Sequence, residues 1–301
     1  MKAWENRSCY LINYRRQVRW LRGLLLGGLC VLMTLCSSAA VTTNLYDNFA
    51  DGDRTTGTTW HFLSDGTGAG AAVASGSLKV DVGTLKRPTT LVTYLTPAAS
   101  PLTLAATGDK ITLTFDVTFG SVYSAAGAID FGFYNSANKR TTGDLVQNST
   151  SSFTNWAGYA VQGRVGNTGA STFVVGEHAV GGNVSPFVLT STATPTIAGN
   201  SQISSNSYSY TLSIERTATG VILSGNLGGS NAFSVVDNTG AFYSFDTLVL
   251  GSTAGINDGS YYTLDNITVT QAQATQEKKL SLFILSYRLE CPGIQAVKRR
   301  V

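Results

Sequence analysis

The chain has 301 residues, 43% of them hydrophobic and 13% charged, so it is long enough to bury a sizeable core. Its four cysteines lie at positions 9, 30, 36 and 291, which excludes a thiolate metal site and a cysteine nucleophile between residues 41 and 271. The formal charge of +3 comes from the two ends of the chain, because residues 41–271 hold nine basic and fifteen acidic residues; this balance, about −6, argues against nucleic acid or an anionic membrane as the partner.

The N-terminus has the order of a secretory signal peptide. Four arginines between Arg15 and Arg22 precede an apolar run, Leu24–Leu32, and the small residues Ser38–Ala40 follow. This order predicts a signal peptide over residues 1–40, cleaved after Ala40, and a mature chain that is secreted or held in the cell envelope. The apolar run is short and broken by glycine, which disfavours an uncleaved anchor and predicts no stable membrane span in the mature chain.

From residue 41 onward the composition favours strands and turns over helices. Apolar and polar residues alternate most clearly in Lys110–Phe119, Tyr208–Glu215 and Tyr262–Val269. Arg216–Gly220 predicts a hairpin turn between two alternating strands. Weaker strands are expected at Leu78–Val82, Thr90–Leu95, Ala128–Tyr134, Gly158–Gly163, Thr172–Val175, Val221–Asn226, Phe233–Val236 and Leu248–Gly251.

This pattern predicts an all-β fold, a two-sheet antiparallel jelly-roll sandwich formed by a single domain over residues 41–271. Alternation on one face is typical of antiparallel sheets, because strands of parallel sheets carry almost continuous apolar runs. No internal repeat or proline-rich linker divides the region. The tail from Ala272 to Val301 turns to Gln, Lys and Leu, ends on basic residues and is expected to be disordered.

Several short motifs resemble those of bacterial secreted proteins with a concanavalin A-like (laminin G-like) sandwich, and more narrowly of PEP-CTERM proteins with that fold. They are Asp47–Phe49, Gly108–Lys110, Ile214–Val221 and Leu264–Val269. The resemblance covers roughly residues 44 to 270 and implies architecture more than activity. The chain departs from the PEP-CTERM pattern after the last strand, where Gln271–Ala274 replaces Pro-Glu-Pro, so the sorting tail is expected to be lost.

The first candidate site is a structural calcium ion, which favours several oxygen ligands. In jelly-roll sandwiches the first and last strands usually pair, which would bring Asp47 close to Asp265, and the resemblance implies a calcium ion between such strands. The alternative is that Asp51–Asp53 and Asn257–Gly259 form turns, in which an aspartate binds its own backbone.

Catalysis has less support from the residues. Glycoside cleavage needs two carboxyl groups about 5 to 10 Å apart, and residues 41–271 hold only two glutamates, Glu177 and Glu215. Asp116 and Asp130 lie on expected strands without a partner at a suitable spacing. Two histidines without cysteine cannot complete a zinc site alone. His61 and His178 are instead expected to lie in surface loops.

Aromatic residues beside polar ones are the best candidates for sugar binding, because ring faces stack on pyranoses and placed polar groups bind the hydroxyls. The proposed glycan contacts are Trp156, Tyr159, Asn155 and Tyr134. The alternative is that such rings build the core, as expected for Trp60 and for Phe115, Phe131 and Phe133.

The sequence therefore predicts an exported, non-catalytic module that binds a polysaccharide or another glycan, or extracellular matrix, at the cell envelope. Two alternatives stay open. One is a hydrolase or lyase acting on polysaccharide, and the other is a structural surface or biofilm protein without a specific ligand.

Overall fold

The computed structural model describes residues 39–64, 67–83, 88–120, 127–145, 151–165, 173–179, 185–187, 189, 191–193, 207–228, 232–252 and 261–274. The signal peptide expected over residues 1–40, except for its last two residues, lies outside these ranges, as does the tail after residue 274. Within the described residues, no helix is long and apolar enough to cross a membrane.

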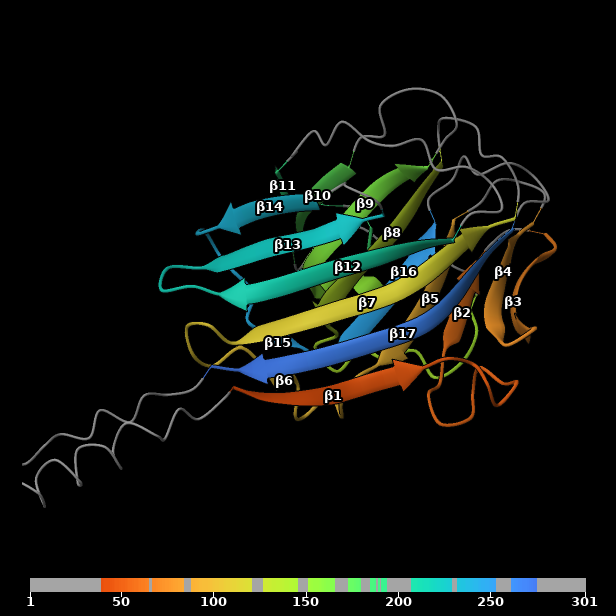
Figure 1. Cartoon of the computed structure of the whole chain (residues 1–301), viewed down its shortest axis with the longest axis horizontal. Coiled ribbons are helices and arrows are strands. Elements are labelled where there is room, and N and C mark those ends of the chain that lie inside the picture. The colour runs from red at the N-terminus through yellow and green to blue at the C-terminus, as the bar shows by residue number, and fades with distance from the viewer. Residues whose placement is uncertain are drawn as a thin grey trace, which may run out of the picture.

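The fold is the predicted two-sheet antiparallel sandwich (Figure 1). Sheet A has the order β14 (Ala232–Asp237), β13 (Val221–Leu227), β12 (Ser207–Arg216), β7 (Lys110–Phe119), β17 (Tyr261–Gln273), β4 (Ser77–Val82) and β3 (Ala69–Ala74), with β1 (Ala40–Asp47) also paired to β17. Sheet B has the order β11 (Ser191–Ala193), β10 (Phe173–His178), β9 (Ala157–Val165), β8 (Gly127–Asn135), β16 (Thr247–Ser252), β5 (Thr89–Tyr94) and β2 (His61–Ser64). A small third sheet pairs β6 (Leu102–Thr103) with β15 (Ser244–Phe245), and one 3-10 helix, η2, spans Ser151–Asn155.

The main core lies between the two sheets and follows from the alternation in the sequence. In β7 every second residue from Ile111 to Phe119 is buried, and each residue between them is only partly buried. Phe115 packs against Phe131 of sheet B, with ring centroids 5.2 Å apart and the rings nearly perpendicular. Removing such side chains from water is the main stabilising contribution, about 1.5–3 kcal/mol for each fully buried large one.

A second apolar cluster covers the other face of sheet B. Gly132 and Gly158 lie on that face, each paired across β8 and β9 with Ala160 or Tyr134. The cluster joins the rings of Phe153, Trp156 and Phe187, which come from outside the sheet, to the strand residues Leu63, Val92, Tyr134, Ala160 and Val249. Sheet B is therefore buried on both faces in this region.

The chain ends of the sandwich confirm one expectation and correct another. β1 and β17 pair antiparallel from Ala40 opposite Gln273 to Asp47 opposite Ile267, so the first and last strands lie side by side (Figure 1). The hairpin at Arg216–Gly220 is also confirmed, since Arg216 pairs with Val221. The boundary expected after residue 271 lies inside β17, because the hydrogen-bonded ladder with β1 continues to Gln273.

Candidate functional site

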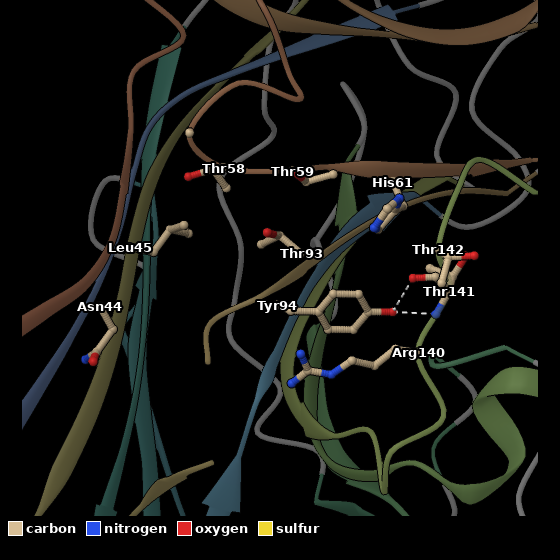
Figure 2. Close-up of a pocket in the computed structure, with 11 residues that line it drawn as sticks. Asn44, Leu45, Thr58, Thr59, His61, Thr93, Tyr94, Arg140, Thr141 and Thr142 are labelled. Carbon is tan, nitrogen blue, oxygen red and sulfur yellow. Dashed lines mark hydrogen bonds between the residues drawn. The ribbon is translucent and has the colours of Figure 1, made fainter. Parts of the chain in front are cut away.

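A cleft of about 590 Å³ opens at one lateral edge of the sandwich, between β1 of sheet A and strands β2 and β5 of sheet B (Figure 2). Two loops complete its walls, one between β1 and β2 and one after β8. The lining residues are Asn44, Leu45, Gly57, Thr58, Thr59, His61, Thr93, Tyr94, Arg140, Thr141 and Thr142. Five threonine hydroxyls, one amide and two ring side chains thus surround the space, and no carboxylate is among the lining residues.

Tyr94 and the loop after β8 hold each other in place. The Thr141 backbone N–H donates to the Tyr94 hydroxyl over 2.6 Å, and this hydroxyl donates to the Thr141 carbonyl over 3.3 Å (Figure 2). The Arg140 guanidinium carbon lies 4.3 Å from the centre of the Tyr94 ring. Burial raises the pKa of Tyr94 to about 12, so its hydroxyl stays protonated at neutral pH. The loop is therefore fixed against β5 by polar and cation–π contacts.

A buried carboxylate fixes the other side of Arg140. Asp246 is 1% exposed and accepts a hydrogen bond of 2.8 Å from Nη2 of Arg140. It also accepts bonds from the Ser136 backbone N–H, the Ser136 hydroxyl and the Thr247 hydroxyl. Because four donors meet this one carboxylate, its buried charge is well compensated.

His61 lies on the cleft wall as a neutral ring. Its centroid is 5.9 Å from that of Tyr94, with the planes tilted by 52°. Burial lowers the pKa of His61; Asp144 opposes this shift, and the positive charge of Arg54 adds to it. A neutral imidazole offers one donor and one acceptor, as sugar hydroxyls do. His61 was expected in a surface loop, but it lies half-buried in β2.

The structure does not bring the four predicted glycan contacts together on a surface. Trp156, Tyr159 and Tyr134 are all 0% exposed, so the prediction that their rings stack on a sugar is wrong. Trp156 and Tyr134 belong to the cluster on the outer face of sheet B, and Tyr159 belongs to the main core. Asn155, at the end of η2, is exposed but has no exposed ring from this set beside it. The alternative, that such rings build the core, holds for these three and for Trp60.

Trp156 instead supports the loop of the cleft. Its indole N–H donates to the Lys139 carbonyl over 2.8 Å, one residue before Arg140. Its ring meets Phe153 edge-on, with centroids 4.7 Å apart. The residue predicted to touch the ligand thus lies behind the residues that line the cleft.

The calcium prediction fails on the donors available to an ion. Strand pairing does place Asp47 near Asp265, and the negative charges of Asp51 and Asp265 add to the burial that raises the pKa of Asp47. The two Asp47 oxygens accept bonds from the Phe49 backbone N–H and the Trp60 indole N–H, each at 2.9 Å, so the carboxylate is held by protein donors. In the described part of the chain, no group of three or more His, Cys, Asp or Glu side chains could hold a metal ion.

The aspartates near the N-terminus form turns instead. Asp51 accepts a bond from the Asp53 backbone N–H, and Asp53 accepts one from the Thr55 backbone N–H. These local bonds are the alternative to calcium that the sequence left open.

Two carboxyl pairs that the sequence did not reveal arise from strand register and from contact between the sheets. Asp116 lies directly opposite Asp265 across β7 and β17, on the outer side of sheet A. A bulge follows, in which Asn266 (φ +51°) donates its amide to Asp116 over 2.9 Å and so offsets the like charges. On the opposite lateral edge, Glu177 of β10 contacts Asp237 of β14 through their carboxyl groups.

The Glu177–Asp237 pair does not have the geometry of a glycosidase. Asp237 raises the pKa of Glu177, so the two carboxyl groups interact directly, whereas even a retaining enzyme keeps its acid and its nucleophile ~5 Å apart. The Tyr159 hydroxyl donates to Asp237 over 2.5 Å and accepts from the Phe242 backbone N–H over 2.9 Å. This arrangement connects the sheets through shared protons. His178, beside Glu177, was also expected in a surface loop but is 0% exposed in β10.

Sequence comparison gives no match, either to protein-family models or to curated proteins. Among solved structures, the Emp46p carbohydrate recognition domain aligns at 11% identity and a TM-score of 0.48, over 75% of this chain and 95% of that one. The lectin UEA-II aligns at 14% identity and a TM-score of 0.42, over 78% and 99% of the two chains. The alginate lyase Aly36B aligns at 13% identity and a TM-score of 0.40, over 75% and 95%. At these values the assignment of function depends on the residues of this chain.

Proposed function

We propose that residues 41–271 form an exported, non-catalytic module that binds a glycan in the cleft between β1 and β5. The observation that carries the proposal is the lining of this cleft, a concave space of about 590 Å³ with five threonines, Asn44, His61 and Tyr94. Hydroxyl and amide groups both donate and accept hydrogen bonds, as sugar hydroxyls do, and ring side chains pack on the C–H faces of a pyranose. The size suits one or two sugar rings.

Export is part of the same proposal and depends on the N-terminal sequence alone. The basic, apolar and small-residue order before Val41 supports secretion or retention in the cell envelope. Polysaccharides of the envelope or of the surrounding matrix are then the accessible ligands.

The binding proposal can be tested on a glycan array by comparing the wild type with a variant whose larger side chain narrows the cleft and leaves the core unchanged. Thr142 lines the cleft and is exposed, so Thr142→Met adds bulk to the wall at little cost to folding. Thr239→Met is the matched control, because Thr239 is exposed at the opposite edge beyond Asp237. We expect the wild type and the control to bind the same glycans, and Thr142→Met to bind them at least tenfold more weakly.

Three other outcomes would contradict the proposal. Absence of binding across the array would favour a structural surface protein. Equal loss in both variants would place the ligand outside the cleft. New reducing ends or unsaturated products on a polysaccharide panel would favour the enzyme alternative.

A further inference from the structure

Arg140 reaches the cleft with hydrogen-bond donors that the protein does not use. Its Nη2 donates to the Thr96 carbonyl over 2.5 Å and to Asp246 over 2.8 Å. In the described part of the chain, its buried Nε has no hydrogen-bond partner, and no hydrogen bond comes from Nη1. Because Nε is buried, a ligand in the cleft cannot reach it, and the donors of Arg140 that remain for a ligand are those of Nη1.

The neighbouring carboxylate cannot take up these donors. Asp246 already accepts four hydrogen bonds, two at each oxygen. The ion pair therefore orients the guanidinium without occupying its whole edge. The Tyr94 ring covers one face of the guanidinium, and 22% of the Arg140 side chain stays exposed. The result is a rigid, partly exposed cation on the wall of the cleft.

We infer that this cleft binds an acidic sugar residue and that Arg140 recognises its carboxylate. The inference rests on the proposed function and specifies its ligand class. A carboxylate is an acceptor-only group with a negative charge, which suits the Nη1 donors of a guanidinium whose Nη2 is already held by Thr96 and Asp246. Arg140 is the one arginine or lysine among the lining residues, and none of them is acidic. The threonines and His61 remain for the hydroxyls of the same sugar.

The charges around the cleft limit the length of the ligand. Residues 41–271 carry a net charge of about −6, so the field of the whole module repels a long polyanion rather than attracting it. A second hollow shares Gly57 and Thr58 with the cleft and is lined by Asp47 and Asp51. Recognition of the carboxylate therefore acts at short range, and short oligomers are the appropriate probes.

The test compares pairs of ligands that differ only in charge. Trimers prepared from pectate, alginate and a glucuronan are each measured beside their carboxyl-reduced counterparts by titration calorimetry. A charge-assisted bond of this kind is worth roughly 1.5–3 kcal/mol, so we expect at least one acidic trimer to bind about tenfold or more tightly than its reduced form. Arg140→Lys keeps a cation for Asp246 but removes the planar donors, and is expected to abolish this ratio.

Arg54→Lys provides the matched control. Arg54 also pairs with a carboxylate at this edge, Asp144, but it does not line the cleft, so its variant is expected to keep the wild-type ratio. If Arg140→Lys does not fold, the wild-type ratio alone decides the ligand class. Equal binding of acidic and reduced trimers overturns the inference and leaves the glycan module standing, whereas failure of every trimer to bind overturns both. A ratio that persists in Arg140→Lys removes the role of Arg140.

Discussion

The two lateral edges of the sandwich are held together by different kinds of charged contact. At the cleft edge, arginine–aspartate pairs hold the loops: Arg54 with Asp144, and Arg140 with Asp246. At the other edge, two carboxyl groups interact, as Glu177 of sheet B lies against Asp237 of sheet A beside the Tyr159 hydroxyl. The first edge is held by ion pairs, whereas the pKa of Glu177 at the second edge is raised to about 7.

This difference indicates which edge is suited to a ligand. A salt-bridged loop can hold unused donors toward solvent without a change of protonation, as Arg140 does at the cleft. At the other edge, the carboxyl groups of Glu177 and Asp237 interact with each other and with the Tyr159 hydroxyl. Two tyrosines thus have different roles at the two edges. Tyr94 lines the cleft, whereas Tyr159 donates a hydrogen bond to Asp237 of the other sheet.

The largest effect is expected at the support of the cleft edge. Trp156→Ala removes a fully buried side chain and leaves a cavity behind the loop that carries Arg140. We expect the free energy of unfolding in urea to fall by about 3–5 kcal/mol, and Trp156→Phe to lose less because the ring volume is largely kept. A variant that keeps its stability but loses glycan binding would restore the direct ligand contact predicted from the sequence.

Breaking the buried ion pair should have the next largest effect. Asp246→Asn leaves Arg140 without its counter-charge, which for a buried pair costs about 3 kcal/mol. The control is Asp81→Asn, since the Lys79–Asp81 pair is 35% and 43% exposed and is expected to contribute less than about 1 kcal/mol. Equal effects of the two variants on chemical denaturation would show that Asp246 does not organise the cleft edge.

The stability contributed by the edge that carries Glu177 and Asp237 should depend on pH. Burial, and then the neighbouring Asp237 carboxyl, raise the pKa of Glu177 from 4.5 to about 7. A raised pKa means that the folded state binds the proton more tightly, so the contribution is complete below pH 4.5 and is lost as pH rises through about 7. Because Glu177 is partly exposed, this contribution is discounted to about 1 kcal/mol.

Glu177→Gln separates this contribution from the other titrations in the protein. The difference in unfolding free energy between wild type and variant should change between pH 4.5 and 8, in favour of the variant at the higher pH. A pH-independent difference would mean that Glu177 and Asp237 do not share a proton.

The smallest effect is expected for chelation. Because both Asp47 oxygens bind N–H groups of the protein, EDTA should leave the melting temperature within about 1 °C of its value in calcium. A ligand bound only to the folded state would raise the melting temperature, so a clear drop on chelation would bring the calcium site back.

The sequence predicted the fold better than the site, for physical reasons. Strand Lys110–Phe119 was identified at its observed bounds, because alternation is a local property that burial of one face requires. β3 was missed because Ala69–Ala74 contains mostly alanine and glycine, which have little β preference. Which rings are exposed is not local: Trp156 is buried by residues from distant strands and loops, such as Leu63, Val92 and Phe187.

The cleft shows the same limit. Thr93 and Tyr94 lie in the strand expected at Thr90–Leu95, yet Asn44 and Arg140 reach them only through sheet pairing and loop packing.

The pairing of β1 with β17 also has a mechanical consequence. Since Ala40 lies opposite Gln273, tension applied through the two ends of the sandwich would unzip this ladder one hydrogen bond at a time instead of shearing all of its bonds together. The opening would reach Asn44 and Leu45, which form a wall of the cleft, well before the central strands are loaded. A module tethered at both ends would therefore release its ligand under stretch while most of its body stays folded.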